Sequence, residues 1–351
     1  MINHQLICKV LGQLLFLEAV LLMVSLGVSI GYQEDDVFAF LVTIFITIGA
    51  GLALKWRGHN ADNSMSRRDA YLVVSLAWIV FSFFGTFPFL TSGYIHSFTD
   101  AYFETMSGFT TTGATIIDNV EVLPHGLLFW RSLTQWIGGL GIVFFTIALL
   151  PSLVGGQIKV FAAEATGPIK TKLHPRLSTS AKWIWSIYIV LTIACIVSYY
   201  FGGMNVFDSF NYAMTTTATG GFATHNTSTE FFHSPTLEYI CTLFTFLSGI
   251  NFTLLYAAVI KLNIKNLFKN SEFKFYIFLV VVFTAFIMME LMTMRHYDLE
   301  RAFRCGLFQV VSFITTTGLF NDDAATWPHV TWVVLAACMF FGACSGSTSG
   351  G

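Results

Sequence analysis

Three short tracts of threonine and glycine carry the residue types that could bind an ion. They are Thr110-Thr111-Thr112-Gly113, Ala218-Thr219-Gly220-Gly221 and Thr315-Thr316-Thr317-Gly318. Glycine permits backbone torsions that turn peptide carbonyls inward, and rings of such carbonyls can replace the hydration shell of a potassium ion. These tracts therefore favour the binding of a dehydrated monovalent cation by peptide oxygens.

Each tract ends a short apolar segment, and the three segments resemble one another. In the first two, Asp100 or Asp208 leads to a methionine and then to a glycine at matched spacing, provided that the second glycine is Gly221 and not Gly220. The third has Cys305 in place of the aspartate and is the weaker match. About twelve helical residues rise about 18 Å, roughly half of a hydrocarbon core about 30 Å thick. The sequence predicts half-membrane helices, with the two aspartates as N-caps.

The elements that must position these tracts are membrane helices. Of the 351 residues, 55% are hydrophobic and only 11% are charged, whereas a soluble domain carries about 25% charged residues. About 20 apolar residues cross a bilayer as a helix. The expected spans are Val10–Tyr32, Val37–Leu54, Tyr71–Leu90, Leu127–Leu150, Trp183–Phe201, Leu237–Ile260, Phe275–Met292 and one that starts near His329. The predicted fold class is an all-α polytopic membrane protein.

The basic residues set the orientation of these spans. Most of the 18 Lys and Arg residues follow the second, fourth and sixth spans or precede the first. Because cytoplasmic loops carry an excess of Lys and Arg, we expect the N-terminus and these basic loops in the cytoplasm. This charge separation works only if the Thr/Gly segments do not cross. The formal net charge of −2 gives no reason to expect a nucleic-acid partner.

Spans and tracts together divide the chain into repeated units. We expect two extra N-terminal helices over residues 1–68, and helix–pore-loop–helix units over 69–150, 183–260 and 275–351. Cytoplasmic loops are expected over 151–182 and 261–274. At this spacing a fourth unit would lie beyond Gly351, and the sequence contains no fourth tract.

A glycine- and serine-rich segment follows the last apolar helix. Its residues are Gly342, Ala343, Cys344, Ser345, Gly346, Ser347, Thr348, Ser349, Gly350 and Gly351. Glycine is a poor helix former, so this segment predicts a break near mid-membrane. It lacks the Gly-Lys-Ser/Thr ending of a phosphate-binding loop. Close packing of helices through small residues is the alternative interpretation.

These stretches resemble the TrkH-type potassium uptake proteins of the Trk/Ktr/HKT superfamily. The resemblance covers essentially the whole chain and rests on Thr110–Ala114, Gln135–Gly141, Ala218–Phe222, Thr315–Leu319 and Gly342–Gly351. It implies that the helix–pore-loop–helix units surround one central pore. It further implies that Gly113, Gly221 and Gly318 are filter glycines, and that the carbonyls of the preceding residues bind potassium. The Gly/Ser segment would be an intramembrane gate.

The resemblance also implies partners and a location. These are a bacterial inner membrane, a homodimer, and a cytosolic nucleotide-binding regulatory subunit of the TrkA type that docks on the cytoplasmic loops. Potassium would be the transported ion, and no organic cofactor is expected on this chain.

Two other functions remain as alternatives. A secondary carrier that binds a cation or small solute at broken helices near the midplane predicts inverted repeats, whereas these repeats share one orientation. A membrane-embedded enzyme needs clustered His, Asp or Glu within the spans, which the sequence does not show.

One arginine lies in an unusual place. Arg131 falls in the outer part of an apolar helix, where a charge is costly. It either shapes the electric field near the filter or pairs with Asp118, Glu121 or Glu104.

Overall fold

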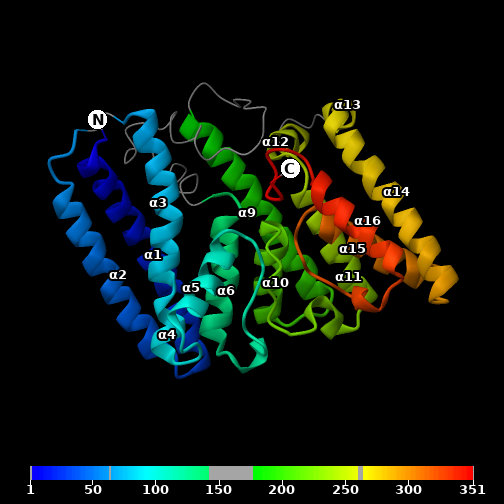
Figure 1. Cartoon of the computed structure of the whole chain (residues 1–351), viewed down its shortest axis with the longest axis horizontal. Coiled ribbons are helices and arrows are strands. Elements are labelled where there is room, and N and C mark those ends of the chain that lie inside the picture. The colour runs from blue at the N-terminus through cyan, green and yellow to red at the C-terminus, as the bar shows by residue number, and fades with distance from the viewer. Residues whose placement is uncertain (1, 63–64, 142–176, 260–263, 351) are drawn as a thin grey trace. The chain divides into compact units, whose positions relative to one another are not determined.

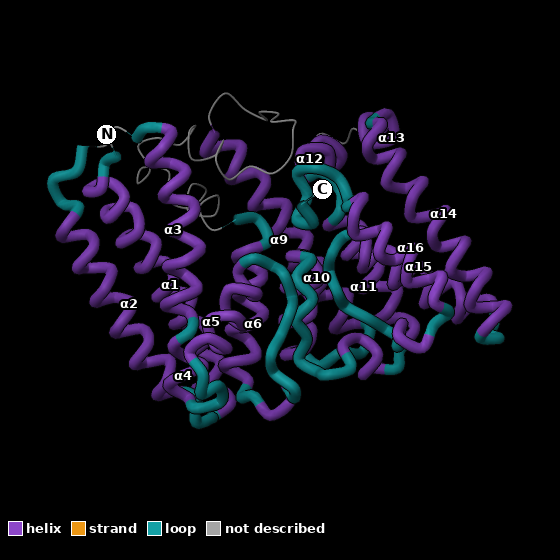
Figure 2. The backbone as a smooth tube through the Cα atoms, in the orientation of Figure 1, coloured by secondary structure: helices purple, strands orange, loops and turns teal. Residues whose placement is uncertain are grey.

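Helices form the regular structure of the described chain (Figure 1). The computed structural model describes residues 2–62, 65–141, 177–259 and 264–350, and Figure 2 shows helices and loops but no strand among them. Within these residues, five helical segments are long and apolar enough to cross a membrane. They are α1 (His4–Tyr32), α2 (Val37–Arg57), α3 (Arg67–Gly85) with α4 (Phe87–Ser92), α9 (Leu177–Phe201) and α14 (Ser271–Met294). The predicted all-α membrane fold is confirmed.

The chain forms two compact units. The first holds α1 to α6 (His125–Gly138) and the beginning of α9 up to Trp185. The second begins at Ser186, within α9, and contains every later helix.

In the first unit, the two N-terminal helices pack closely and are joined to the start of α6. A side chain at Gly12 would come within 2.8 Å of the carbonyl oxygen of Gly51, so α1 and α2 can approach only through glycine. Beyond α1, Glu34 accepts hydrogen bonds from the backbone N–H of His125 at 2.5 Å, and its second oxygen lies 2.7 Å from the ring Nδ1 of the same histidine. The ring of Tyr32 stacks on His125.

In the second unit, two short helices pack against several other helices. These short helices are α10 (Val206–Ala218) and α15 (Leu299–Ile314). α10 contacts α11 (Pro235–Ser248), and α15 contacts α11, α14 and α16 (His329–Phe341). The helices α12 (Phe252–Val259) and α13 (Ile264–Lys269) follow α11 along the chain. Tyr199 of α9, Tyr212 of α10 and Phe308 of α15 share one buried cluster. Apolar packing in this cluster thus joins both short helices to α9.

Two helices end earlier than the hydropathy predicts, and a third ends where the glycines predict. α6 ends at Gly138, and residues 142–150 of the predicted span lie outside the described residues. The predicted span Leu237–Ile260 is wrong as a continuous helix, because α11 and α12 meet at a bend of 104°. α16 ends at Phe341, at the start of the predicted break in the Gly/Ser segment. The residues that cap these ends are Gly139, Gly249 and Gly342, and hydropathy does not register the poor helix propensity of glycine.

The two predicted cytoplasmic loops are covered only in part. Most of 151–182 lies outside the described residues, and α9 begins at Leu177, before the predicted end of that loop. In the loop predicted over 261–274, residues 261–263 lie outside the described part, while α13 and the first turn of α14 occupy most of the remainder.

Candidate cation-binding site

Each Thr/Gly tract follows a short helix with a side-chain N-cap. The helices are α5 (Phe98–Phe109), α10 and α15, and their N-caps are Ser97, Asn205 and Asp298. The prediction that Asp100 and Asp208 are the caps is wrong, because both lie three residues further along. There their backbone N–H groups donate hydrogen bonds to the side-chain oxygens of Ser97 and Asn205. A carboxylate in the first turn is still favoured by the helix dipole.

All three short helices end in the same hydrogen-bonded turn. In α5, the N–H of Thr112 donates to the carbonyl of Ser107 at 2.9 Å, and that of Thr111 donates to Gly108 at 3.0 Å. The same pair of bonds joins Gly220 to Thr215 and Thr219 to Thr216, and it joins Thr317 to Ser312 and Thr316 to Phe313. This is the Schellman arrangement, which requires one residue in the left-handed region. In each tract, that residue is a threonine.

The tracts also share an unusual sequence of backbone torsions. φ is +54° at Thr111, +52° at Thr219 and +55° at Thr316. Two residues later, φ is +75° at Gly113, +86° at Gly221 and +82° at Gly318, and the residue between has no positive φ. A β-branched residue rarely adopts such a torsion, and holding it costs on the order of 1–3 kcal/mol. In an extended strand, successive carbonyls point to opposite sides. A positive φ at every second residue breaks this alternation in the tracts.

The predicted site residues differ in their exposure from one tract to the next. Thr110 and Thr112 are exposed within the first unit, and their hydroxyls lie 2.8 Å apart. Ala218, Thr219 and Gly220 are buried in the second unit. In the third tract, Thr315 and Thr317 are buried and 2.8 Å apart, whereas Thr316 and Gly318 are exposed.

The second and third tracts meet backbone to backbone. A Cβ atom at Gly221 would overlap the carbonyl oxygen of Thr317 and would lie 3.2 Å from its carbonyl carbon. Only glycine fits here, both for its torsion and for this close approach. Gly318 has a similar torsion but no neighbour within 4 Å of such a Cβ. The second unit thus brings two of the three predicted tracts together.

The Gly/Ser segment docks on the break between α11 and α12 and on the first turn of α14. Five hydrogen bonds hold it: Cys344 N to Gly249 O (3.0 Å), Phe252 N to Gly346 O (3.0 Å), Thr348 Oγ1 to Ser248 O (3.1 Å), Asn251 Nδ2 to Ser345 O (2.5 Å) and Ser345 N to Glu272 Oε1 (2.6 Å). Gly342, Gly346 and Gly350 have positive φ, which explains the glycine content. Gly351 lies outside the described residues.

Arg131 pairs with Glu104, one of the three acids that the sequence left open. Its Nη2 lies 2.8 Å from Glu104 Oε1, and the two side chains are 2% and 0% exposed. Glu104 also accepts hydrogen bonds from the Thr115 hydroxyl at 2.9 Å and from the backbone N–H of Ile116 at 3.1 Å. The carboxylate therefore joins α5, α6 and the segment that follows the first tract.

A second buried carboxylate, Asp208, also joins a short helix to the segment that follows its tract. It accepts a hydrogen bond from the Thr224 hydroxyl at 2.6 Å and lies 3.3 Å from His225 Nε2. Burial raises its pKa, but the hydrogen bonds from His225, Thr224 and Asn205 outweigh burial and hold the pKa of Asp208 below its usual range. Nothing in the local sequence singles out His225 as a partner.

This lowered pKa predicts how pH affects stability. Because the folded pKa of Asp208 lies below the unfolded value, its contribution is complete above the unfolded pKa and is lost as pH falls through the folded one. We expect Asp208→Asn to lower the free energy of unfolding at pH 7 by about 1.5–3 kcal/mol, and to do so less at pH 3. Unfolding curves in micelles at both pH values measure this difference. The exposed Asp118→Asn is the control, and an equal loss for Asp208→Asn at both pH values would contradict the assignment.

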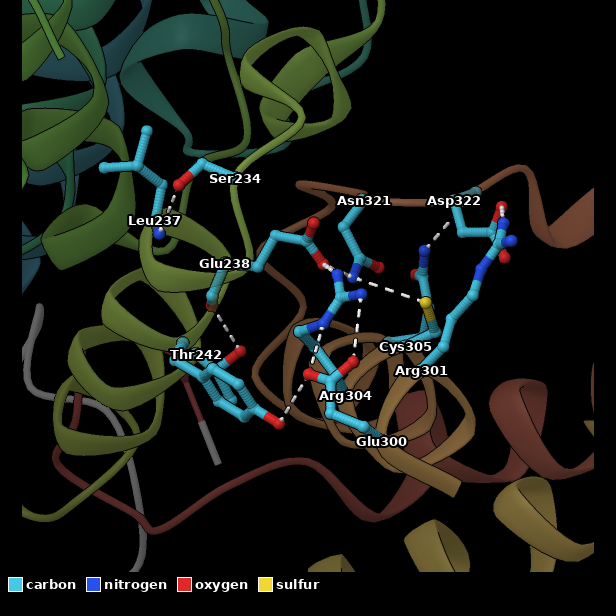
Figure 3. Close-up of polar contacts among 12 residues, drawn as sticks. Ser234, Leu237, Glu238, Thr242, Glu300, Arg301, Arg304, Cys305, Asn321 and Asp322 are labelled. Carbon is cyan, nitrogen blue, oxygen red and sulfur yellow. Dashed lines mark hydrogen bonds and ion pairs between the residues drawn. The ribbon is translucent and has the colours of Figure 1, made fainter. Parts of the chain in front are cut away.

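A third cluster lies beside the third tract (Figure 3). Glu238 of α11 binds Arg304 of α15 through Nη1 at 2.5 Å and accepts a hydrogen bond from Asn321. Arg304 also binds Glu300 at 2.8 Å. The sequence does not indicate this cluster, because Glu238 and Arg304 are 66 residues apart and neither shows a distinctive spacing.

Among the described residues, no group of three or more His, Cys, Asp or Glu side chains is arranged to hold a metal ion. The groups available to a cation at the tracts are therefore peptide carbonyls and threonine hydroxyls.

Comparisons with known proteins agree with the fold. The family model described as "TrkH: Cation transport protein" matches residues 36–351. The Trk system potassium uptake protein TrkH of Escherichia coli (strain K12) is 36% identical over 350 residues, which are 98% of this chain and 72% of that protein. The TrkH of Halomonas elongata is 35% identical, over 99% of this chain and 72% of the relative. The crystal structure of the potassium transporter TrkH from Vibrio parahaemolyticus superimposes with a TM-score of 0.84 at 35% identity, covering 98% of this chain and 71% of that one.

Proposed function

The chain belongs to the TrkH family of cation transport proteins, and from that premise we propose that it carries potassium across the membrane through a carbonyl-lined pore. Membership of this family makes it a transporter and not an enzyme. The observation that carries the proposal is the backbone pattern shared by the three tracts, with positive φ two residues apart at Thr111 and Gly113 and at the matching positions.

In this proposal the filter consists of Thr110–Gly113, Ala218–Gly221 and Thr315–Gly318. Their carbonyls replace the water around potassium. The carboxyl ends of α5, α10 and α15 point their partial negative charge at the tracts, which favours a cation there. The close contact between Gly221 and Thr317 supports the proposal, because filter segments must approach one another to share an ion.

The Gly/Ser segment, Gly342–Gly351, is the proposed gate. Its described residues bind the break between α11 and α12 by backbone and side-chain hydrogen bonds, not by apolar packing alone. Such bonds can be exchanged for water at little net cost, since each is worth only about 0.5–1.5 kcal/mol. A segment held in this way can leave and return.

Substitution of Asn251 tests the gate. Its Oδ1 accepts from the N–H of Thr253 at 2.8 Å at the start of α12, while its Nδ2 holds Ser345. Asn251→Asp keeps the acceptor and removes the donor, so we expect potassium flux to rise about fivefold, as the loss of about 1 kcal/mol predicts. Asn251→Ala removes both the acceptor and the donor. Its comparison with Asn251→Asp therefore measures the effect of losing the cap of α12. A flux for Asn251→Asp equal to or below that of the unaltered protein would count against a gate at Ser345.

Ion flux into proteoliposomes tests the transport itself. With the full-length protein, potassium and rubidium should enter while sodium is excluded. Saturable exchange that requires a second solute would favour the secondary carrier instead. If the proteoliposomes show neither selective cation flux nor coupled exchange, the proposed transport is wrong.

The proposed organisation follows the sequence expectations. Residues 1–68 add two helices, 69–150, 183–260 and 275–351 are the pore-loop units, and 151–182 and 261–274 face the cytoplasm with the N-terminus. The chain is a multi-pass membrane protein, and we place it in a bacterial inner membrane. The name "Trk system" of the relatives supports a complex with other components. We propose a homodimer with a cytosolic nucleotide-binding subunit of the TrkA type.

A further inference from the structure

A buried carboxylate binds the residue three positions after each tract glycine. Counted from Gly113, Gly221 and Gly318, these residues are Ile116, Thr224 and Asn321. The Ile116 N–H donates to Glu104 at 3.1 Å, the Thr224 hydroxyl donates to Asp208 at 2.6 Å, and the Asn321 amide donates to Glu238. One attachment point thus recurs in all three repeats.

Each of these carboxylates also has a basic partner. Arg131 lies 2.8 Å from Glu104, His225 lies 3.3 Å from Asp208, and Arg304 lies 2.5 Å from Glu238. Glu104, Asp208 and Glu238 are 1%, 4% and 5% exposed. A buried carboxylate is tolerated when its oxygens accept hydrogen bonds. Each of these three carboxylates is therefore a fixed acceptor for the residue that follows its tract.

The three carboxylates come from different places in the repeats. Glu104 and Asp208 lie on the short helices α5 and α10, at different distances before the glycine, whereas Glu238 lies on the long helix α11. Their hydrogen-bond donors differ too: a backbone amide, a hydroxyl and a side-chain amide. What recurs is the attached position, not a residue type, and this points to a requirement at that position.

We propose that Glu104, Asp208 and Glu238 are positioning residues that fix the far end of each tract and thereby set the selectivity for potassium over sodium. The inference rests on the proposed function. The near end of each tract is already fixed by its Schellman turn. A carboxylate at the far end leaves the carbonyls between them little freedom to close around the smaller sodium ion.

The third repeat offers the sharpest test, because its parts can be separated (Figure 3). Glu238→Gln weakens the hold on Asn321, and Asn321→Ala removes it while leaving the ion pair with Arg304 in place. Glu300→Gln is the matched control, since Glu300 binds the same arginine and the hydroxyl of Tyr239, but no residue of the tract. Full-length protein in proteoliposomes gives potassium and sodium flux for each variant, and unfolding midpoints report on folding.

For Glu238→Gln and Asn321→Ala, we expect the ratio of potassium to sodium flux to fall about tenfold, as loss of a hydrogen bond to a charged group predicts. Potassium flux itself should persist, and Glu300→Gln should keep the original ratio. Should Glu238→Gln fail to fold, Asn321→Ala decides alone. If the unaltered protein is potassium-selective and folded Asn321→Ala keeps the same ratio of potassium to sodium flux, the positioning role is wrong. If the unaltered protein itself shows no selectivity, the proposed function fails instead.

Discussion

Gly221→Ala should abolish most potassium flux, because the added methyl group has no space. It would overlap the carbonyl oxygen of Thr317, a group proposed to bind the ion, and the backbone there has φ of +86°. The torsion alone costs on the order of 1–3 kcal/mol, which lowers a rate about 5- to 150-fold if the cost falls on the conducting state. Displacement of the neighbouring tract adds to this cost.

Two glycines serve as controls for this prediction. Gly318→Ala meets the same torsional strain, with φ of +82°, but no atom within 4 Å, so it should impair flux less than Gly221→Ala. Gly27→Ala in α1 meets neither strain nor a neighbour and should leave flux unchanged. Flux measured per folded protein compares the three. Equal flux for Gly221→Ala and Gly27→Ala would show that contact between the second and third tracts does not matter for conduction.

Arg131→Met should be among the most destabilising single substitutions in the first unit. It leaves Glu104, which is 0% exposed, without its charged partner, and breaking a buried pair in this way costs about 3–5 kcal/mol. Arg301→Met is the control, because Arg301 is 49% exposed and lies 3.8 Å from Asp322. Such a surface pair is worth about 0–1 kcal/mol. Unfolding in mixed micelles measures the difference.

The double variant Glu104→Leu/Arg131→Met separates charge from packing. Removing both charges leaves no uncompensated ion, so this variant should be more stable than Arg131→Met alone. It should not recover fully, because the Ile116 N–H loses its acceptor. If Arg131→Met is no less stable than Arg301→Met, the pair is not the anchor that its burial indicates.

Hydropathy predicted the long helices of this fold, and the spacing of the tracts predicted their matching glycines. The long apolar runs became α1, α2, α9 and α14, because about 20 apolar residues without breaks have few structures open to them in a membrane. The spacing of the tracts also favoured Gly221 over Gly220, and Gly221 has the positive φ that matches Gly113 and Gly318.

The sequence predicted less where a local property competes with hydropathy or where partners are distant. The run from Leu237 to Ile260 is apolar throughout, yet Gly249 and Asn251 break it, because Asn251 caps α12 with its side chain. The N-caps were placed three residues too late, since Ser97 and Asn205 are as suitable as aspartate. Pairs such as Glu238 and Arg304 arise only from the tertiary fold.

The position of a bound ion tests the central claim most directly. Crystals of the full-length protein grown with rubidium or thallium allow the ion to be located by its anomalous scattering. We predict a peak bounded by the carbonyls of Thr110–Gly113, Ala218–Gly221 and Thr315–Gly318. A peak among side chains at the bend between α11 and α12, with the Thr/Gly tracts empty and flux intact, would contradict it.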